Sequence, residues 1–233
     1  KEYRTFNWAH VVPGLIGPTG TMQTAGAAFS WLKNEVCTEE SAEATRSGIS
    51  PYELINRQIE SSRPGANGLL FLPYLLGERS PRWDAHAKGA FIGLKMEHKR
   101  ADILRSVVEG IGMNLNIILQ VFREQIAIDE ITVIGGMAQG RIVRQIFADI
   151  FELPIKPLNY LEEATSMGAA VTAGVGVGAL SGFDQIDRFI ETNQGEMPNE
   201  RYSHTYQKLQ LAFEQAYTGL KQVNLTLSDM IED

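Results

Sequence analysis

EITVIGGMAQGRIVRQIFADIFELPI, residues 130–155, predicts a strand, a tight turn, a helix and a second strand in direct succession. The apolar run 131–134 is expected to be a buried strand, and a short second strand is expected at 154–156. Between them, apolar residues recur at helical spacing, namely Ile142, Ile146, Phe147 and Ile150. Units of this kind build α/β domains, so the segment predicts one mixed α/β domain.

The turn inside this unit, Gly135-Gly136-Met137-Ala138-Gln139-Gly140, is the first candidate binding site. Glycine lets the chain turn sharply and lets a flat base or a phosphate approach the backbone, and the free N–H groups that open a helix attract negative charge. The spacing is not that of the phosphate-loop or dinucleotide consensus. A plain tight turn is therefore equally consistent with these six residues.

Two further segments are candidates for a site. Gly26 and Ser30 lie on a helix expected over 23–36, where small residues open a groove that a flat base can enter, although helix packing is the explanation that these residues alone favour. The loop Glu78–Asp84 gathers charges, an aromatic ring and a proline between two short apolar runs that predict strands. A solvated turn and a site-bordering loop explain it equally well.

The remaining elements are predicted to be helices. Ser50 followed by Pro51 and Glu53 resembles a capping box that opens one helix, after a polar stretch without predicted structure. A long helix facing the core is expected over 99–125, with Gly110 and Gly112 marking close packing. A helix of small residues is expected over 163–178, buried rather than spanning a membrane. The last helix, 200–223, carries a stripe of tyrosine, leucine and phenylalanine that predicts core packing.

Composition limits the possible partners. The 233 residues are 44% hydrophobic and 21% charged, with a formal charge of -7, so they describe an ordinary globular protein and argue against nucleic acid as a partner. Cys37 is the single cysteine, which excludes an internal disulfide and fits the cytoplasm. The amino terminus shows no basic-then-apolar leader pattern, and the four histidines lack metal-ligand spacing. The sequence contains no G-x-S-x-G nucleophile elbow, so no motif supports a hydrolase.

A longer pattern resembles the FGGY family of carbohydrate kinases. Its most specific part is similar to a family signature: Gly89, Phe91, Gly93 and Leu94, then, after seven further residues, Asp102, Ile103, Ser106, Val107, Val108 and Glu109. The loop PRWD with the following AKG, the segment GTMQTAGAAFSWL and the glycine turn with the helix behind it are also similar to family segments. Within the family, the pentulose kinases, above all those of xylulose, resemble the chain most, with the gluconate kinases near.

The resemblance implies an actin-like, ribonuclease-H-like α/β fold with a mixed sheet flanked by helices. It implies that ATP binds with its adenosine part beside Gly26 and Ser30, and with its base and ribose near Gly135, Gly136, Met137 and Gly140. The family often has Gln at position 30 and Asn or Ser at position 140. Two polar contacts to the nucleotide are thus expected to be missing, with Gln139 as a replacement.

The resemblance also implies that the nucleotide and the sugar are bound by two different domains. Residues 1–233 correspond to the C-terminal nucleotide-binding domain of a two-domain kinase, whose N-terminal domain binds the sugar, supplies the catalytic aspartate and is absent here. The fragment is therefore expected to bind ATP or ADP weakly, with Mg²⁺ held through the phosphates and the absent half, and to be inactive alone. A homodimer is left open. The alternative is a non-catalytic actin-like binding or assembly module.

Overall fold

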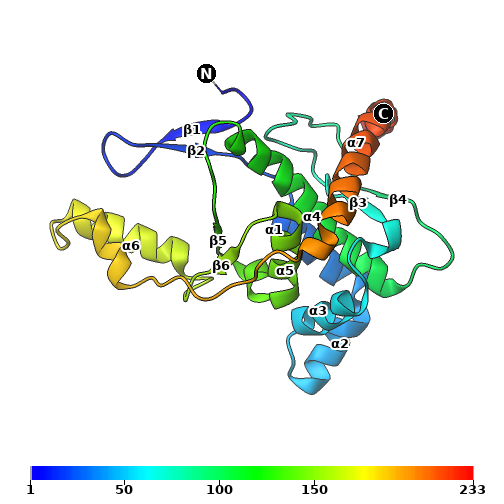
Figure 1. Cartoon of the computed structure of the whole chain (residues 1–233), viewed down its shortest axis with the longest axis horizontal. Coiled ribbons are helices and arrows are strands. Elements are labelled where there is room, and N and C mark those ends of the chain that lie inside the picture. The colour runs from blue at the N-terminus through cyan, green and yellow to red at the C-terminus, as the bar shows by residue number, and fades with distance from the viewer. Residues whose placement is uncertain (1, 233) are drawn as a thin grey trace.

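The computed structural model describes residues 2–232 (Figure 1). The first half of the chain forms β1 (Phe6–Ala9), β2 (Ile16–Thr19), α1 (Ala25–Trp31), the π-helical turn η1 (Leu32–Val36), α2 (Thr38–Ser47), α3 (Pro51–Ser61), the 3₁₀ turn η2 (Ala66–Gly68), β3 (Leu70–Leu72), β4 (Ala90–Ile92) and α4 (Arg100–Arg123). The second half forms β5 (Ile131–Val133), the 3₁₀ turn η3 (Gly136–Gln139), α5 (Arg141–Phe151), β6 (Ile155–Pro157), α6 (Ala164–Gly176), the 3₁₀ turns η4 (Phe183–Arg188) and η5 (Glu200–Tyr202), and α7 (Ser203–Glu232).

The strands pair in twos. β1 with β2 and β3 with β4 are antiparallel, whereas β5 and β6 are parallel, with α5 as their crossover helix. Both strand orientations expected of a mixed sheet are therefore present. Over the described range, however, they form three separate two-stranded sheets rather than one sheet.

Helix α4 is the centre of the core. Its residues from Leu104 to Asn114 are all buried, and it packs against α1, α3, β3, α5 and α7 (Figure 1). The two glycines predicted to mark close packing do so: a Cβ atom on Gly110 would lie 2.1 Å from the Phe71 carbonyl oxygen, and one on Gly112 would lie 2.8 Å from Ile150 Cδ1. Both the long helix and its role agree with the prediction.

Two buried carboxylates tie α4 to the turn that follows α3. Asp102 Oδ1 accepts hydrogen bonds from Ser62 Oγ at 2.6 Å and from Asn67 Nδ2 at 2.7 Å. Glu109 Oε1 accepts from the Gly65 backbone N–H at 2.9 Å, and also from Arg105 Nε at 2.7 Å and the Tyr206 hydroxyl at 2.8 Å. Residues 62–67 are thereby fixed on the first turns of α4.

The loop Glu78–Asp84 is not a solvated turn. Glu78 and Asp84 exchange backbone hydrogen bonds, of 2.8 and 3.0 Å, and the Glu78 side chain accepts from Asn114 Nδ2 at 2.6 Å. Arg82 forms an ion pair with Glu214 at 3.0 Å, and its guanidinium lies 3.8 Å from the centre of the Tyr217 ring. The loop is therefore packed between α4 and α7. The aromatic stripe of α7 is buried at Tyr206, Phe213 and Tyr217, as predicted for a core helix.

Four predictions about elements are wrong. The polar stretch before Ser50 forms α2. The capping box at Ser50 does not form: the Ser50 side chain makes no capping hydrogen bond, and Glu53 pairs with Arg57. The strand expected to be buried at 131–134 is only partly so, with Thr132 and Ile134 exposed. The reason is that β5 pairs with a single strand, β6. Only Val171 of α6 is buried, since the helix extends away from the α4 core (Figure 1).

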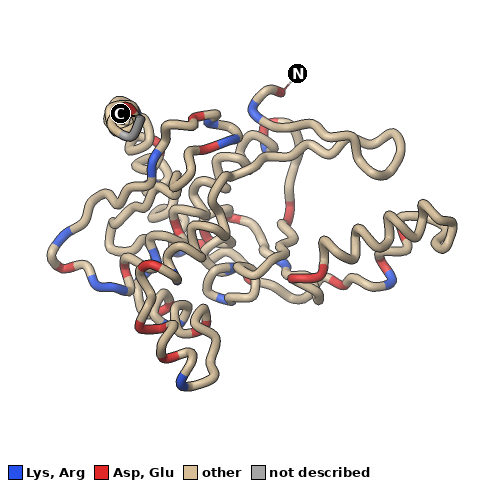
Figure 2. Tube along the Cα trace, turned by 180° about the vertical axis from the view of Figure 1, so that it is seen from behind, with Lys and Arg blue, Asp and Glu red and all other residues tan. Residues whose placement is uncertain are grey.

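The projecting parts of the molecule carry few charges. Figure 2 shows the β1–β2 hairpin and most of α6 without Lys, Arg, Asp or Glu, whereas charges are spread over the rest. The stretches 5–32 and 164–183 contain no charged residue. A search of the described helices finds none with the length and apolar character to cross a membrane.

Candidate functional site

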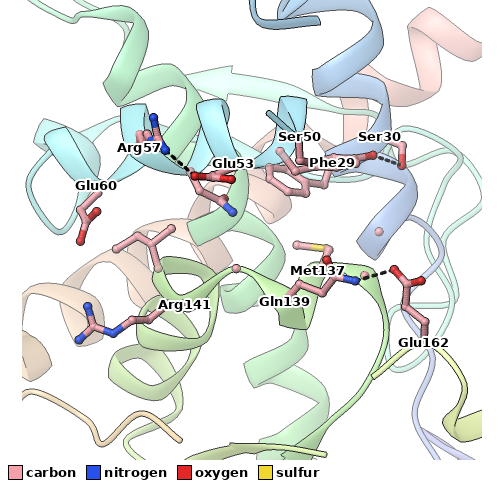
Figure 3. Close-up of a pocket in the computed structure, with 16 residues that line it drawn as sticks. Phe29, Ser30, Ser50, Glu53, Arg57, Glu60, Met137, Gln139, Arg141 and Glu162 are labelled. Carbon is pink, nitrogen blue, oxygen red and sulfur yellow. Dashed lines mark hydrogen bonds and ion pairs between the residues drawn. The ribbon is translucent and has the colours of Figure 1, made fainter. Parts of the chain in front are cut away.

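A cavity of about 660 Å³ lies between α1, α3 and the turn that joins β5 to α5. This volume is within the range of small-molecule sites, roughly 300–1,000 Å³. Figure 3 shows α3 on one side of the cavity and the glycine turn on the other, with the end of α1 beside them. Segments about eighty residues apart in the chain thus face each other across a single space.

The first wall comes from α1 and α3. A Cβ atom on Gly26 would meet no heavy atom within 4 Å, so helix packing is not the reason for glycine at this position, and Gly26 opens onto the cavity. Ser30 Oγ lies 3.3 Å from the Tyr52 hydroxyl, and the Phe29 and Tyr52 rings are 5.3 Å apart. The wall therefore combines aromatic surface with hydroxyl groups, a surface suited to a flat, partly polar ligand.

The opposite wall is the glycine turn. Gly135 has φ of +88°, which favours glycine, and its N–H donates to the Leu161 carbonyl at 2.7 Å. Arg144 supports the turn from behind by donating to the carbonyls of Ala138 and Gln139, at 2.5 and 3.0 Å. The Arg144 guanidinium is itself paired with the buried Glu196, at 2.6 Å. This wall is thus held in place by the fold before any ligand arrives.

Charged side chains line the rim of the cavity (Figure 3). Arg57 forms an ion pair with Glu53 on α3, and Gln139 Nε2 donates to Glu162 Oε1 at 2.5 Å. Glu60 and Arg141 complete the charged part of the lining. Three carboxylates and two guanidinium groups leave the rim slightly acidic, so the base and ribose of a nucleotide fit here better than its phosphates.

Six of the seven predicted nucleotide residues line this cavity: Gly26, Ser30, Gly136, Met137, Gln139 and Gly140. Gly135 does not line it, and shapes the turn instead. Contact of these residues with a nucleotide stays a prediction. None of the residues of the loop Glu78–Asp84, the other candidate segment, lines the cavity.

Sequence reasoning missed the contribution of α3. Its polar face lines the cavity with Tyr52, Glu53, Asn56, Arg57 and Glu60. The spacing of these residues was visible in the sequence, because positions three and four apart share a helix face. What was missing was the direction of that face, which depends on how Ile55 and Ile59 pack in the core.

Among residues 2–232, no group of three or more His, Cys, Asp or Glu side chains is placed to hold a metal ion. Whether the phosphates and other segments hold Mg²⁺ stays a prediction.

The same arrangement of elements occurs in solved sugar kinases. The crystal structure of xylulose kinase from Rhodospirillum rubrum superposes with a TM-score of 0.77 at 28% identity, covering 96% of this chain and 43% of that one. This is the actin-like, ribonuclease-H-like fold of these kinases, which confirms the predicted fold class.

Sequence comparison gives the family. Residues 4–177 match the FGGY family of carbohydrate kinases, C-terminal domain, and the chain belongs to this family. It is 37% identical over 220 residues to xylulose kinase from Staphylococcus epidermidis, and 33% identical over 219 residues to gluconokinase from Bacillus licheniformis. These alignments cover 94% and 90% of this chain but 42% of each relative. The chain thus spans less than half the length of the curated relatives it matches.

Proposed function

We propose that this chain is the ATP-binding part of a sugar kinase, and that its cavity holds the adenosine part of the nucleotide. The observation that carries the proposal is the convergence of α1, α3 and the glycine turn on one preformed cavity. A flat base fits between the aromatic surface of Phe29 and Tyr52 and the Met137 side of the turn. Glycine at positions 26 and 136 lets the ligand approach the backbone.

The reaction proposed for the whole protein is transfer of the γ-phosphate of ATP to a hydroxyl of a ketopentose such as xylulose. The relatives named xylulose kinase support a pentulose, and those named gluconokinase make a sugar acid the competing substrate. Phosphoryl transfer depends on positioning and on neutralising charge, with Mg²⁺ supplying charge neutralisation at the phosphates. The residues of this chain hold and orient the base. They offer no assigned catalytic base, so we expect the chain alone to be inactive. The whole kinase is proposed to work in the cytoplasm.

The binding proposal is tested by thermal unfolding with and without Mg-ATP. A ligand that binds only the folded state stabilises it, by about 2.7 kcal/mol at a hundred times its dissociation constant. We expect Mg-ATP to raise the midpoint of thermal unfolding of the wild-type chain. It should not raise the midpoint of Gly26→Leu, whose leucine side chain would fill open space in the cavity.

The matched control is Gly219→Leu. Gly219 also lies on a helix with no heavy atom within 4 Å of a Cβ atom, but on α7, away from the cavity. This variant should respond to Mg-ATP as the wild type does. A wild-type midpoint that ignores saturating Mg-ATP would contradict the proposal and favour an actin-like binding or assembly module. Phosphorylation of xylulose by this chain alone would contradict its expected inactivity.

A further inference from the structure

Asn56, on the face of α3 that lines the cavity, has a side-chain oxygen without a partner. Its Oδ1 atom is buried and accepts no hydrogen bond from any described residue. Buried polar atoms in folded proteins are nearly always paired, and a half-turn of the carboxamide would exchange Oδ1 with Nδ2, the atom that lies against Gly140 in the opposite wall. The other three unpaired buried side-chain atoms of the described chain, on Thr21, Arg82 and Glu109, do not line this cavity.

The position of the Asn56 carboxamide depends on a glycine in the opposite wall. A Cβ atom on Gly140 would lie 2.6 Å from Asn56 Nδ2 and 3.3 Å from Asn56 Cγ. Any side chain at position 140 would therefore push the carboxamide away. Gln139, the other carboxamide that lines the cavity, is already paired with Glu162. The Asn56 amide is thus the one that remains for a ligand in this part of the lining.

A carboxamide presents one acceptor and two donors in a plane. The edge of adenine is complementary, because its exocyclic amine donates beside a ring nitrogen that accepts, the pairing by which asparagine reads adenine in nucleic acids. We propose that Asn56 is the base-reading residue of this cavity: a half-turn of its carboxamide brings Oδ1 to the cavity side, where it accepts from the exocyclic amine of adenine. The proposal rests on the proposed function, since it requires a nucleotide in the cavity.

The test removes the hydrogen bond between Asn56 and adenine in two ways, once by changing the nucleotide and once by changing the protein. Dissociation constants are measured by calorimetry for ATP and for purine riboside triphosphate, which lacks the exocyclic amine, with the wild type and with Asn56→Ala. For the wild type we expect ATP to bind about tenfold more tightly than the analogue, the value of one hydrogen bond to a buried acceptor. For Asn56→Ala the two nucleotides should bind equally.

Two further variants separate base reading from a structural role. Arg57→Ala, next to Asn56 at the rim of the cavity, should change the affinities for both nucleotides by the same factor. Gly140→Ala should weaken ATP binding in the wild-type background and have less effect in Asn56→Ala, because the closest clash is then removed and only Val143 Cγ2, at 3.2 Å, remains in tight contact. Without nucleotide, Asn56→Ala should unfold at the same temperature as the wild type or higher, since an unpaired acceptor has been removed.

Each outcome has one meaning. Equal wild-type affinities for ATP and the analogue, or an ATP preference that persists in Asn56→Ala, would overturn the role of Asn56 and leave the nucleotide site intact. If neither nucleotide binds the wild type, the proposed function itself fails. A lower unfolding temperature for Asn56→Ala without nucleotide, together with an unchanged ATP preference, would assign Asn56 to structure.

Discussion

Asp102 and Glu109 belong to the most specific part of the family pattern, yet neither lines the cavity. Both are buried and accept hydrogen bonds from residues between α3 and β3. The residues that identify the family most clearly in the sequence therefore hold the backbone of the domain together. The residues that line the cavity were instead suggested by weaker signals, the glycine turn and Gly26, whose meaning depended on the resemblance.

The acid sensitivity of the domain is expected to depend partly on Asp102. Burial alone would raise its pKa, but hydrogen bonds from the Ser62 hydroxyl, the Lys99 backbone N–H and the Asn67 side chain hold the pKa below the ordinary value of an aspartate. A lowered folded-state pKa contributes stability above the unfolded-state pKa, and that stability is lost as the pH falls through the folded-state value. Asp102→Asn should therefore lower the free energy of unfolding at pH 7 by about 1.5–3 kcal/mol, and by less below about pH 4.

Urea unfolding of both proteins across this pH range measures the difference. Asp129→Asn, an exposed carboxylate before β5, provides the control and should change the unfolding free energy little at either pH. A loss in Asp102→Asn that is the same at every pH would show that the ionisation of Asp102 does not contribute.

At the scale of elements, periodicity predicted the helices with one clear apolar face. It predicted α4, α5 and α7, although α7 continues nine residues beyond its expected end at Val223, whereas α3 was expected from the start signals at Ser50 and Pro51. α2 was missed because it is mostly polar, so its sequence resembles a loop. The errors about burial at β5 and α6 have another cause. An apolar pattern indicates a preference for burial, but not whether another part of the molecule covers that face.

The packing of α4 on β3 provides a matched pair of glycine substitutions. Gly110→Ala places a methyl group against the Phe71 backbone oxygen, which cannot move away as a flexible side chain can. We expect a loss of about 1–3 kcal/mol in the free energy of unfolding, the usual effect of overpacking.

The comparison is Gly219→Ala on α7, where the added methyl meets nothing within 4 Å. There we expect a gain of up to about 1 kcal/mol, since alanine is the better helix former. Chemical denaturation of the two variants measures both changes. Equal effects would show that helix propensity, and not the contact with Phe71, governs position 110.

At the scale of the whole molecule, the apolar residues are not all collected in the core. On and beside the β1–β2 hairpin, Trp8, Val11, Leu15 and Ile16 are 56%, 57%, 55% and 69% exposed. This hairpin and α6 extend from the same side of the molecule (Figure 1), and both belong to uncharged stretches. Exposed apolar side chains gathered on one hairpin, where Trp8 and Ile16 lie on paired strands, indicate a contact surface or a tendency to associate.

We expect this surface to bind hydrophobic dyes in the native state. Fluorescence of anilinonaphthalene sulfonate should rise with the wild-type chain and rise much less with the double variant Trp8→Lys/Ile16→Lys, which places charges on the hairpin. The control is Leu211→Lys, because Leu211 is 66% exposed on α7, away from the hairpin. Equal dye binding by the wild type and the double variant would show that the hairpin is not the responsive surface.

The two walls of the cavity have a consequence for the order of events during synthesis. α1 and α3 leave the ribosome well before the glycine turn, with all of α4 made between them. Domains fold as units as their chains emerge, and the early wall has no opposite face until residue 140 has been made and α5 has packed on α4. A nucleotide in this cavity would therefore bind only after the two walls have come together, so its binding would not assist the early steps of assembly.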